Sequence, residues 1–495
     1  MSTQPFLLPT LLISLIFLNF FELSAQHVEL DVQADSLHFS ITTGSSSEPF
    51  FSQRLPNDIF ENRTTQLSSI QTFVTNYGII GLNPAPGNAG FVWPKGSGKA
   101  YMFGGGFWFG TKKQVSGTSA MKEYTVLGYN PNTGRSWFVP GPITQPYLNS
   151  GIDTTYEGIL NNRLYISTDY RNGTGIPYDT HDVANGGSGW PVWHTQEKEE
   201  GGKNHYFGDM IFPVGDRTLD NWPKGPVMIS DQDMVAVYKD TDLSRYEIGE
   251  QEAMDEGYPI GLQVEQRLYS WGTGPLSDVL IIRYAFINVS NDTLFDSFFA
   301  PVYDVDIGAA GNDRMRTVIV DPDEDTLDLG VMWSESTGGD QGYGYLGFDF
   351  IQSPAVYEDG EKKGFIRNDK IYFRNEEQLG LHSFRNWVID IDPVTHEEKY
   401  PFISTEARDG DNGAGDKRMA LSTGPFNMLP GDTAVIALGI VLANPRGSTP
   451  SGEWEDMESL IEKDLAAQRF WDTFTRTNSV EDAWERLLIG PLDLR

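Results

Sequence analysis

Aspartate and asparagine side chains stand at short intervals in two loops that follow apolar runs of the sequence. Oxygen atoms at such spacing can turn toward one hard cation, and calcium takes about six to eight oxygen ligands. The sequence therefore predicts a calcium site in these loops. Its candidate ligands are Asp304, Asp306, Asn312, Asp313, Asp321, Asp323 and Asp325.

A second interpretation of these loops stays open. The segment that begins at Asp321 starts like the calcium loop of an EF-hand, but Thr326 stands where that loop needs glycine and Met332 where it needs glutamate. Aspartate and asparagine also form turns by accepting hydrogen bonds from nearby backbone. Ion-free turns are therefore the alternative here and in a third acidic loop. That third loop contains Asp409, Asp411, Asn412 and Asp416.

Other motifs that carry chemistry are incomplete. Gly96-Ser97-Gly98-Lys99 lacks the pattern of a phosphate-binding loop, because Trp93 stands at the position of its first glycine and Ala100 at the position of its hydroxyl residue. Residues 104–110 lack the dinucleotide-binding spacing and predict a glycine-rich strand whose aromatic side chains pack in the core. No Gly-x-Ser-x-Gly sequence occurs, so a serine hydrolase of that type has no support.

Two further groups of side chains lie in a glycine-rich region before residue 223. Its histidines lack zinc spacing and are read as loop residues, with a transition-metal site as the alternative. Its tryptophans could stack on sugars, although tryptophan is more often part of a core. These residues are His181, His194, His205, Trp190, Trp193 and Trp222. With 69 acidic residues in the chain, the sequence singles out no catalytic carboxylate pair.

The charge balance narrows the classes of partner. Lys and Arg number 36 against 69 Asp and Glu, which gives a formal net charge of −33. Such a surface repels phosphate backbones, so we expect no nucleic-acid partner. An acidic excess suits divalent cations, neutral glycans or solubility alone. The chain contains no cysteine, so its stability depends on packing and on any bound ions rather than on disulfides.

Residues 1–25 predict a signal peptide. An apolar run from Leu11 to Phe21 precedes Leu23-Ser24-Ala25, a small-residue cleavage site. No Lys or Arg precedes Arg54, so the usual basic start of a signal is missing, and an apolar strand or a membrane anchor is the alternative. No later segment has the length of a transmembrane span. A secretory signal without cysteine fits export from a Gram-negative bacterium.

Strand patterns dominate the rest of the chain and would position the acidic loops. Residues 262–271 alternate apolar and polar side chains and predict a half-exposed strand, while residues 279–287 and 434–442 predict buried strands. Short polar turns between such runs indicate an all-β, multi-sheet, β-sandwich-like fold. Only the C-terminal part has helical periodicity, over residues 453–474 and 481–488.

These patterns give four regions. They are the signal peptide (1–25), an N-terminal β region (26–220), a β-sandwich-like domain with the acidic loops (221–445) and a C-terminal helical segment (446–495). Whether the two β regions share one core stays open at this stage.

An ordered set of motifs runs along the chain and includes Trp93-Pro94-Lys95-Gly96-Ser97-Gly98, Ser230-Asp231-Gln232-Asp233-Met234, Pro259-Ile260-Gly261-Leu262-Gln263-Val264, Asp304-Val305-Asp306-Ile307-Gly308, Gly347-Phe348-Asp349-Phe350 and Leu421-Ser422-Thr423-Gly424-Pro425-Phe426. These motifs resemble those of large exported proteins of Bacteroidota and neighbouring phyla, mostly uncharacterised, many of which carry a type IX secretion sorting tail. The resemblance implies an all-β body and a secreted or cell-surface location, and it brings no catalytic residues. The sorting tail is missing after the helical segment, which leaves the periplasm open.

The sequence thus supports two hypotheses of function. The first is a non-catalytic exported protein of the envelope or extracellular space, with a glycan or an envelope protein as partner and calcium in its acidic loops. The alternative is an extracellular hydrolase of polysaccharides that uses a carboxylate pair.

Overall fold

The computed structural model describes residues 60–84, 87–142, 162–170, 211–213, 224–226, 229–241, 256–318, 329–335, 342–354, 364–365, 378–477 and 480–489. Several predictions from the sequence fall outside these residues. They are the signal peptide, the three histidines His181, His194 and His205, the three tryptophans Trp190, Trp193 and Trp222, and the candidate ligands Asp321, Asp323 and Asp325.

The larger of two main sheets is antiparallel and has nine strands. Most of these strands are rich in β-branched and aromatic residues, which pack well on a pleated surface. Their order is β10 (Tyr165–Ile166), β13 (Gln232–Lys239), β14 (Leu262–Ser270), β15 (Val279–Asn288), β24 (Thr433–Ala443), β19 (Tyr345–Gln352), β18 (Leu329–Ser334) and β17 (Asp313–Val318), with β9 (Val139–Pro140) paired to β13.

The second main sheet has seven strands and holds the candidate site. Its order is β22 (Ala407–Arg408), β21 (Ser383–Val388), β23 (Lys417–Met428), β16 (Leu294–Val305), β7 (Gly104–Gln114) and β8 (Met121–Leu127), with β20 (Gly364–Phe365) paired to β23. Two-stranded hairpins flank the main sheets. They are formed by β1 (Asn62–Thr64) with β2 (Phe73–Thr75), β3 (Leu82–Asn83) with β4 (Asn88–Ala89), β5 (Phe91–Val92) with β6 (Ala100–Met102), and β11 (Ile211–Pro213) with β12 (Lys224–Pro226).

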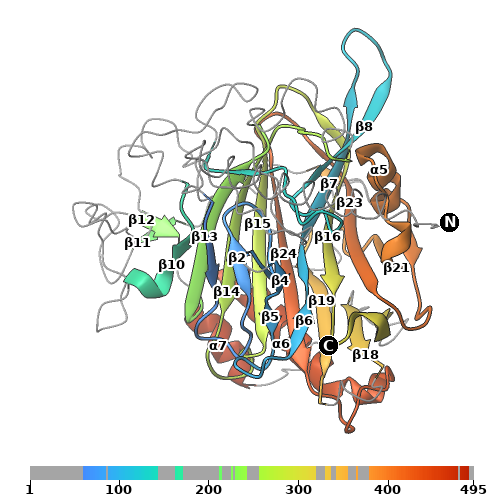
Figure 1. Cartoon of the computed structure of the whole chain (residues 1–495). Coiled ribbons are helices and arrows are strands. Elements are labelled where there is room, and N and C mark those ends of the chain that lie inside the picture. Colours follow the sequence, from blue (N-terminus) through green and yellow to red (C-terminus); the bar gives the residue numbers. More distant parts are fainter. Residues whose placement is uncertain are drawn as a thin grey trace, which may run out of the picture.

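The two sheets pack face to face through aromatic side chains. Phe107 of β7 has its ring centroid 5.4 Å from that of Tyr284 and 5.2 Å from that of Phe286, both on β15. Tyr303 of β16 stacks on Phe348 of β19 at 4.2 Å. Such aromatic pairs stabilise a core beyond their area burial. The predicted all-β sandwich is therefore confirmed, and Figure 1 shows the strands of the two sheets side by side.

Helices cover the outer face of each sheet. On the seven-stranded sheet, Phe402 of α5 (His396–Ser404) contacts Trp387 of β21 at a centroid distance of 4.8 Å. On the nine-stranded sheet, Trp471 of α6 (Glu458–Thr477) contacts Tyr269, and α7 (Val480–Ile489) packs beside α6. The C-terminal helical segment is thus confirmed. In Figure 1 α5 lies beside β21 and β23, and α6 and α7 lie near the lower ends of β14 and β15.

The two β regions share one hydrophobic core. Strand β7, before residue 220, pairs with β16 over eight aligned residues from Phe295 to Asp304. One cluster of buried side chains contains Phe107 and Phe109 of β7 together with Phe286 and Phe299 from the later region. The expected boundary near residue 220 therefore does not separate two cores.

Strand β14 differs from its expected exposure. The alternating pattern predicted a half-exposed strand, but every residue of β14 is buried. The polar side chains of Glu265 and Arg267 share a face with Tyr269, against which Trp471 of α6 packs. Since β13 and β15 flank the strand and a helix packs on its polar face, alternation here does not mark a solvent-facing surface. Within the described residues no helix has the length and apolarity of a membrane span.

Candidate metal centre

Two of the acidic loops meet where β16 ends and β23 begins. Asp304 is the penultimate residue of β16, Asp306 follows the strand, and Asp416 immediately precedes β23. The strands are antiparallel, with Val305 opposite Lys417, so the end of one lies beside the start of the other. This pairing brings the first and third acidic loops of the sequence together.

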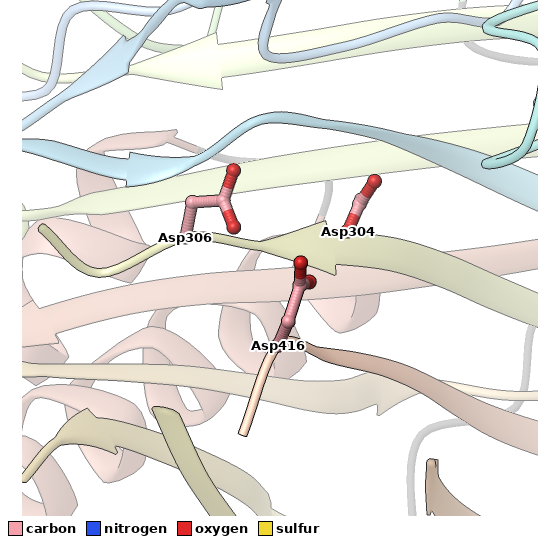
Figure 2. A group of neighbouring side chains, drawn as sticks. All are labelled: Asp304, Asp306 and Asp416. Carbon is pink, nitrogen blue, oxygen red and sulfur yellow. The ribbon is translucent and has the colours of Figure 1, made fainter. Parts of the chain in front are cut away.

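Three carboxylates converge at this junction. Asp304, Asp306 and Asp416 each offer an oxygen, and these oxygens lie within 4.8 Å of one another. Asp304 is 8% exposed, while Asp306 and Asp416 are half-buried. In Figure 2 the carboxylate of Asp416, just before β23, reaches up toward the space between the other two. All three donors are hard oxygens, which fits calcium better than the nitrogen and sulfur ligands that zinc prefers.

The loop that carries Asp416 is held in place by contacts to β17. Asp313 and Gly415 exchange two backbone hydrogen bonds of 3.1 Å. Arg314 donates to Asp411 at 2.7 Å, which attaches the loop a second time. Asp313 also accepts a hydrogen bond from the backbone N–H of Ile307 at 3.2 Å, which fixes the turn after Asp306.

The remaining predicted ligands that the structure describes, Asn312 and Asp313, make hydrogen bonds within the loops, as do residues of the third acidic loop. Asn312 donates to the backbone oxygen of Glu335 at 3.2 Å, and Asp313 fixes the turn described above. In the third loop Asp409 accepts from the backbone of Asn386 at 3.0 Å, and Asn412 accepts from Lys417. The structure therefore brings together Asp304 and Asp306 from the predicted set and adds Asp416. The loop of Asp416 was noted in the sequence, but nothing in its spacing indicated its neighbours.

Arg418 is the cation that faces these acids. It lies opposite Asp304 in the β16–β23 pairing, and its Nη2 is 3.4 Å from Asp304 Oδ2. The same guanidinium pairs with Asp392 and donates to Asn132 Oδ1 at 2.7 Å and to the backbone oxygen of Pro131 at 3.0 Å. One positive charge is thus shared between two carboxylates, and Asp306 and Asp416 add two more nearby, which leaves a local negative excess.

Burial, and after it this negative excess, raise the pKa of the carboxyl groups. Burial raises the pKa of Asp304 to about 6, against the opposing effect of Arg418. Burial, and then the charges of Asp304 and Asp416, raise the pKa of Asp306 to about 7. The pKa of Asp416 is also raised, by burial and then by Asp390. A cluster of this kind gains free energy from a bound proton or a bound cation.

The raised pKa of Asp306 gives a test in the absence of metal. Its folded-state pKa of about 7 lies above the ordinary 3.8, so the folded protein holds the proton more tightly and loses stability as pH rises from about 4 to 7. Asp306→Asn keeps the side chain neutral. In chelator we expect the free energy of unfolding of this variant to match that of the parent near pH 4 and to exceed it at pH 8 by on the order of 1 kcal/mol. Urea unfolding at both pH values measures the difference in free energy of unfolding. A variant that is less stable than the parent at pH 8 would contradict the prediction.

The fold and this centre define the chain as an all-β sandwich protein with an acidic cluster at a strand junction. No protein-family model and no curated protein matches the chain. Among solved structures, it is similar to a GH36 alpha-galactosidase from Geobacillus stearothermophilus in complex with stachyose. The identity is 8%, the match covers 84% of this chain and 44% of that chain, and the TM-score is 0.23. Similarity at that level carries no argument about function.

Proposed function

We propose that this chain is an exported, non-catalytic binding or structural protein of the cell envelope or extracellular space, and that its acidic centre binds calcium. The observation that carries the proposal is the group of Asp304, Asp306 and Asp416 within 4.8 Å of one another, with one arginine shared between Asp304 and Asp392. The export and the location rest on the signal-like N-terminus and on the resemblance to exported Bacteroidota proteins.

The position of the centre supports a structural role for the ion. Asp304 and Asp306 belong to the end of β16, and Asp416 to the start of β23, so one cation would connect two neighbouring strands and the loop between β22 and β23. Asp304 is nearly buried. A site that is mostly enclosed by the fold suits an ion better than a polymeric substrate.

A calcium titration tests the proposal. Ion binding to the native state alone raises the free energy of unfolding, by about 2.7 kcal/mol when free calcium exceeds Kd about a hundredfold. We expect the purified chain to melt at a higher temperature in calcium than in chelator. The double variant Asp306→Asn/Asp416→Asn should lose most of this shift, because it removes two of the three charged donors.

The matched control removes the same charge elsewhere. Glu455 and Glu462 are exposed carboxylates on the C-terminal segment, so Glu455→Gln/Glu462→Gln should keep the full calcium shift. An equal shift in both double variants would place the calcium effect away from the centre. No shift in the parent chain would make the three aspartates ion-free acids and remove calcium from the proposal.

One observation favours the alternative of a polysaccharide hydrolase. The raised pKa of Asp306, about 7, belongs to a carboxyl group that could act as a general acid, and another carboxylate lies within 4.8 Å. Retaining glycosidases place their two carboxyl groups about 5–5.5 Å apart. Release of reducing ends from a panel of polysaccharides, lost in Asp306→Asn, would favour the hydrolase. Equal release of reducing ends by parent and variant would mean that any hydrolase activity does not depend on Asp306.

A further inference from the structure

A fully buried tyrosine lies against the acidic centre. Tyr129 rests on the glycine-rich start of β7, and its side chain occupies the space that side chains at Gly104 and Gly106 would fill. A Cβ at Gly104 would lie 2.9 Å from the hydroxyl oxygen of Tyr129, and one at Gly106 would lie 2.6 Å from its Cβ. The backbone oxygen of Tyr129 accepts a hydrogen bond from Trp108 Nε1 at 2.9 Å, which fixes the residue on this face.

Strand register places the hydroxyl beside the centre. Gly104 of β7 pairs with Asp304 of β16, which pairs in turn with Arg418 of β23. Residues directly opposite each other in an antiparallel sheet present their side chains on the same face. The Tyr129 hydroxyl, which lies over Gly104, is therefore next in the row to the carboxylate of Asp304. The charges of Asp304 and Asp306 also act on the pKa of Tyr129, which burial raises well above its ordinary value.

This hydroxyl has no hydrogen-bond partner among the described residues, although Tyr129 is 0% exposed. Buried polar groups in native proteins are nearly always paired, so an orphaned donor indicates a partner such as water or an ion. A tyrosine hydroxyl carries its proton at neutral pH, so it can donate a hydrogen bond. Its neighbour in the row is the carboxylate of Asp304, which shares the guanidinium of Arg418 with Asp392.

We infer that the Tyr129 hydroxyl donates a hydrogen bond to a water molecule bound to the cation of this centre. The inference rests on the proposed function, since it needs an ion at Asp304, Asp306 and Asp416. Three carboxylates do not fill the coordination shell of calcium, and water takes the remaining positions. A buried donor that orients such a water contributes to ion affinity without touching the ion.

The loop that begins at Tyr129 also contacts Arg418, the positive charge that faces the centre. Pro131 and Asn132 lie two and three residues after Tyr129, and both accept hydrogen bonds from Arg418. The loop from Tyr129 to Asn132 therefore contacts the centre twice, through the hydroxyl on one side and through the guanidinium on the other. An ion that recruits the hydroxyl would hold this loop more firmly on the sheet.

Tyr129→Phe separates this role from a role in folding. Partners of this kind typically change metal affinity about 10–100-fold. We expect calcium to bind the variant at least about tenfold more weakly than the parent in isothermal titration calorimetry. In chelator the variant should unfold at the same urea concentration or a higher one, because the lost hydroxyl makes no hydrogen bond in the ion-free protein.

Tyr303→Phe is the matched control. Tyr303 is also fully buried, and its hydroxyl also has no partner among the described residues. Its ring, however, stacks on Phe348 between the two sheets, whereas Tyr129 lies on the outer face with the acidic centre. The control should bind calcium with the affinity of the parent.

The outcomes distinguish the two claims. Weaker binding by Tyr129→Phe alone, with unchanged stability in chelator, supports the inference. Equal calcium affinity in parent and Tyr129→Phe overturns the inference and leaves the calcium centre intact. A variant that is less stable in chelator also overturns it, because the hydroxyl then serves the fold itself. A parent chain that binds no calcium overturns both claims.

Discussion

Gly105→Ala is expected to lower the free energy of unfolding by about 3 kcal/mol, at the upper end of what overpacking a core usually costs. Gly105 of β7 lies opposite Tyr303 of β16, and a Cβ there would fall 1.8 Å from the ring of Tyr303. That ring cannot move aside easily, because it is fully buried and stacked on Phe348 at 4.2 Å. Urea unfolding of parent and variant gives the difference.

The control for this prediction is a glycine with open space around it. A Cβ at Gly410 would meet nothing within 4 Å, so Gly410→Ala should change the free energy of unfolding by less than about 0.5 kcal/mol. The clash itself is tested in a Tyr303→Ala background, where adding Gly105→Ala should cost much less than it does alone. Equal costs in both backgrounds would mean that Tyr303 does not fill the space above Gly105.

The glycine-rich strand shows what the sequence could predict and what it could not. Its aromatic residues predicted a core strand, and Phe107 and Phe109 do pack between the sheets. The reason for the glycines was not predictable, because it lies in Tyr303 and Tyr129, which are far from β7 in the chain or outside any strand. Continuous apolar runs such as β15 and β24 were predicted correctly, since a run that is apolar on both faces has few stable places outside a core.

Helix α5 was missed, although its start carries a local signal. Thr395 accepts from the backbone of Glu398 and Glu398 accepts from the backbone of Thr395, which is a complete capping box. Pro401 lies inside this short helix, and only Tyr400, Ile403 and two polar residues are buried. An amphipathic pattern is therefore almost absent, and packing on the sheet decides the conformation.

The candidate centre was only half predictable. Asp304 and Asp306 stood out by their alternation after an apolar strand, which is a local property of the sequence. Asp416 joins them only through the pairing of β16 with β23, and Arg418 is 114 residues from its partner Asp304. Strand register sets both contacts, and no spacing within one loop encodes it.

Arg418→Met is expected to lower the free energy of unfolding in chelator by about 3–5 kcal/mol at pH 8, because breaking a buried ion pair leaves the partner charges uncompensated. The side chains of Asp304 and Asp392 are 11% and 5% exposed, and both pair with this guanidinium. Methionine keeps much of the apolar volume, so the loss reflects mainly charge and hydrogen bonds. Thermal or urea unfolding measures it.

Calcium and acid should each reduce this loss if Arg418 acts as a counter-charge. A bound ion would neutralise Asp304 in place of the guanidinium, and the raised pKa of Asp304, about 6, means that a proton does the same at pH 5. Arg446→Met is the control, because Arg446 and its partner Glu458 are 72% and 60% exposed, and such pairs contribute less than about 1 kcal/mol. A loss in Arg418→Met that is equal in calcium, in chelator and at pH 5 would instead assign Arg418 to its hydrogen bonds with Pro131 and Asn132.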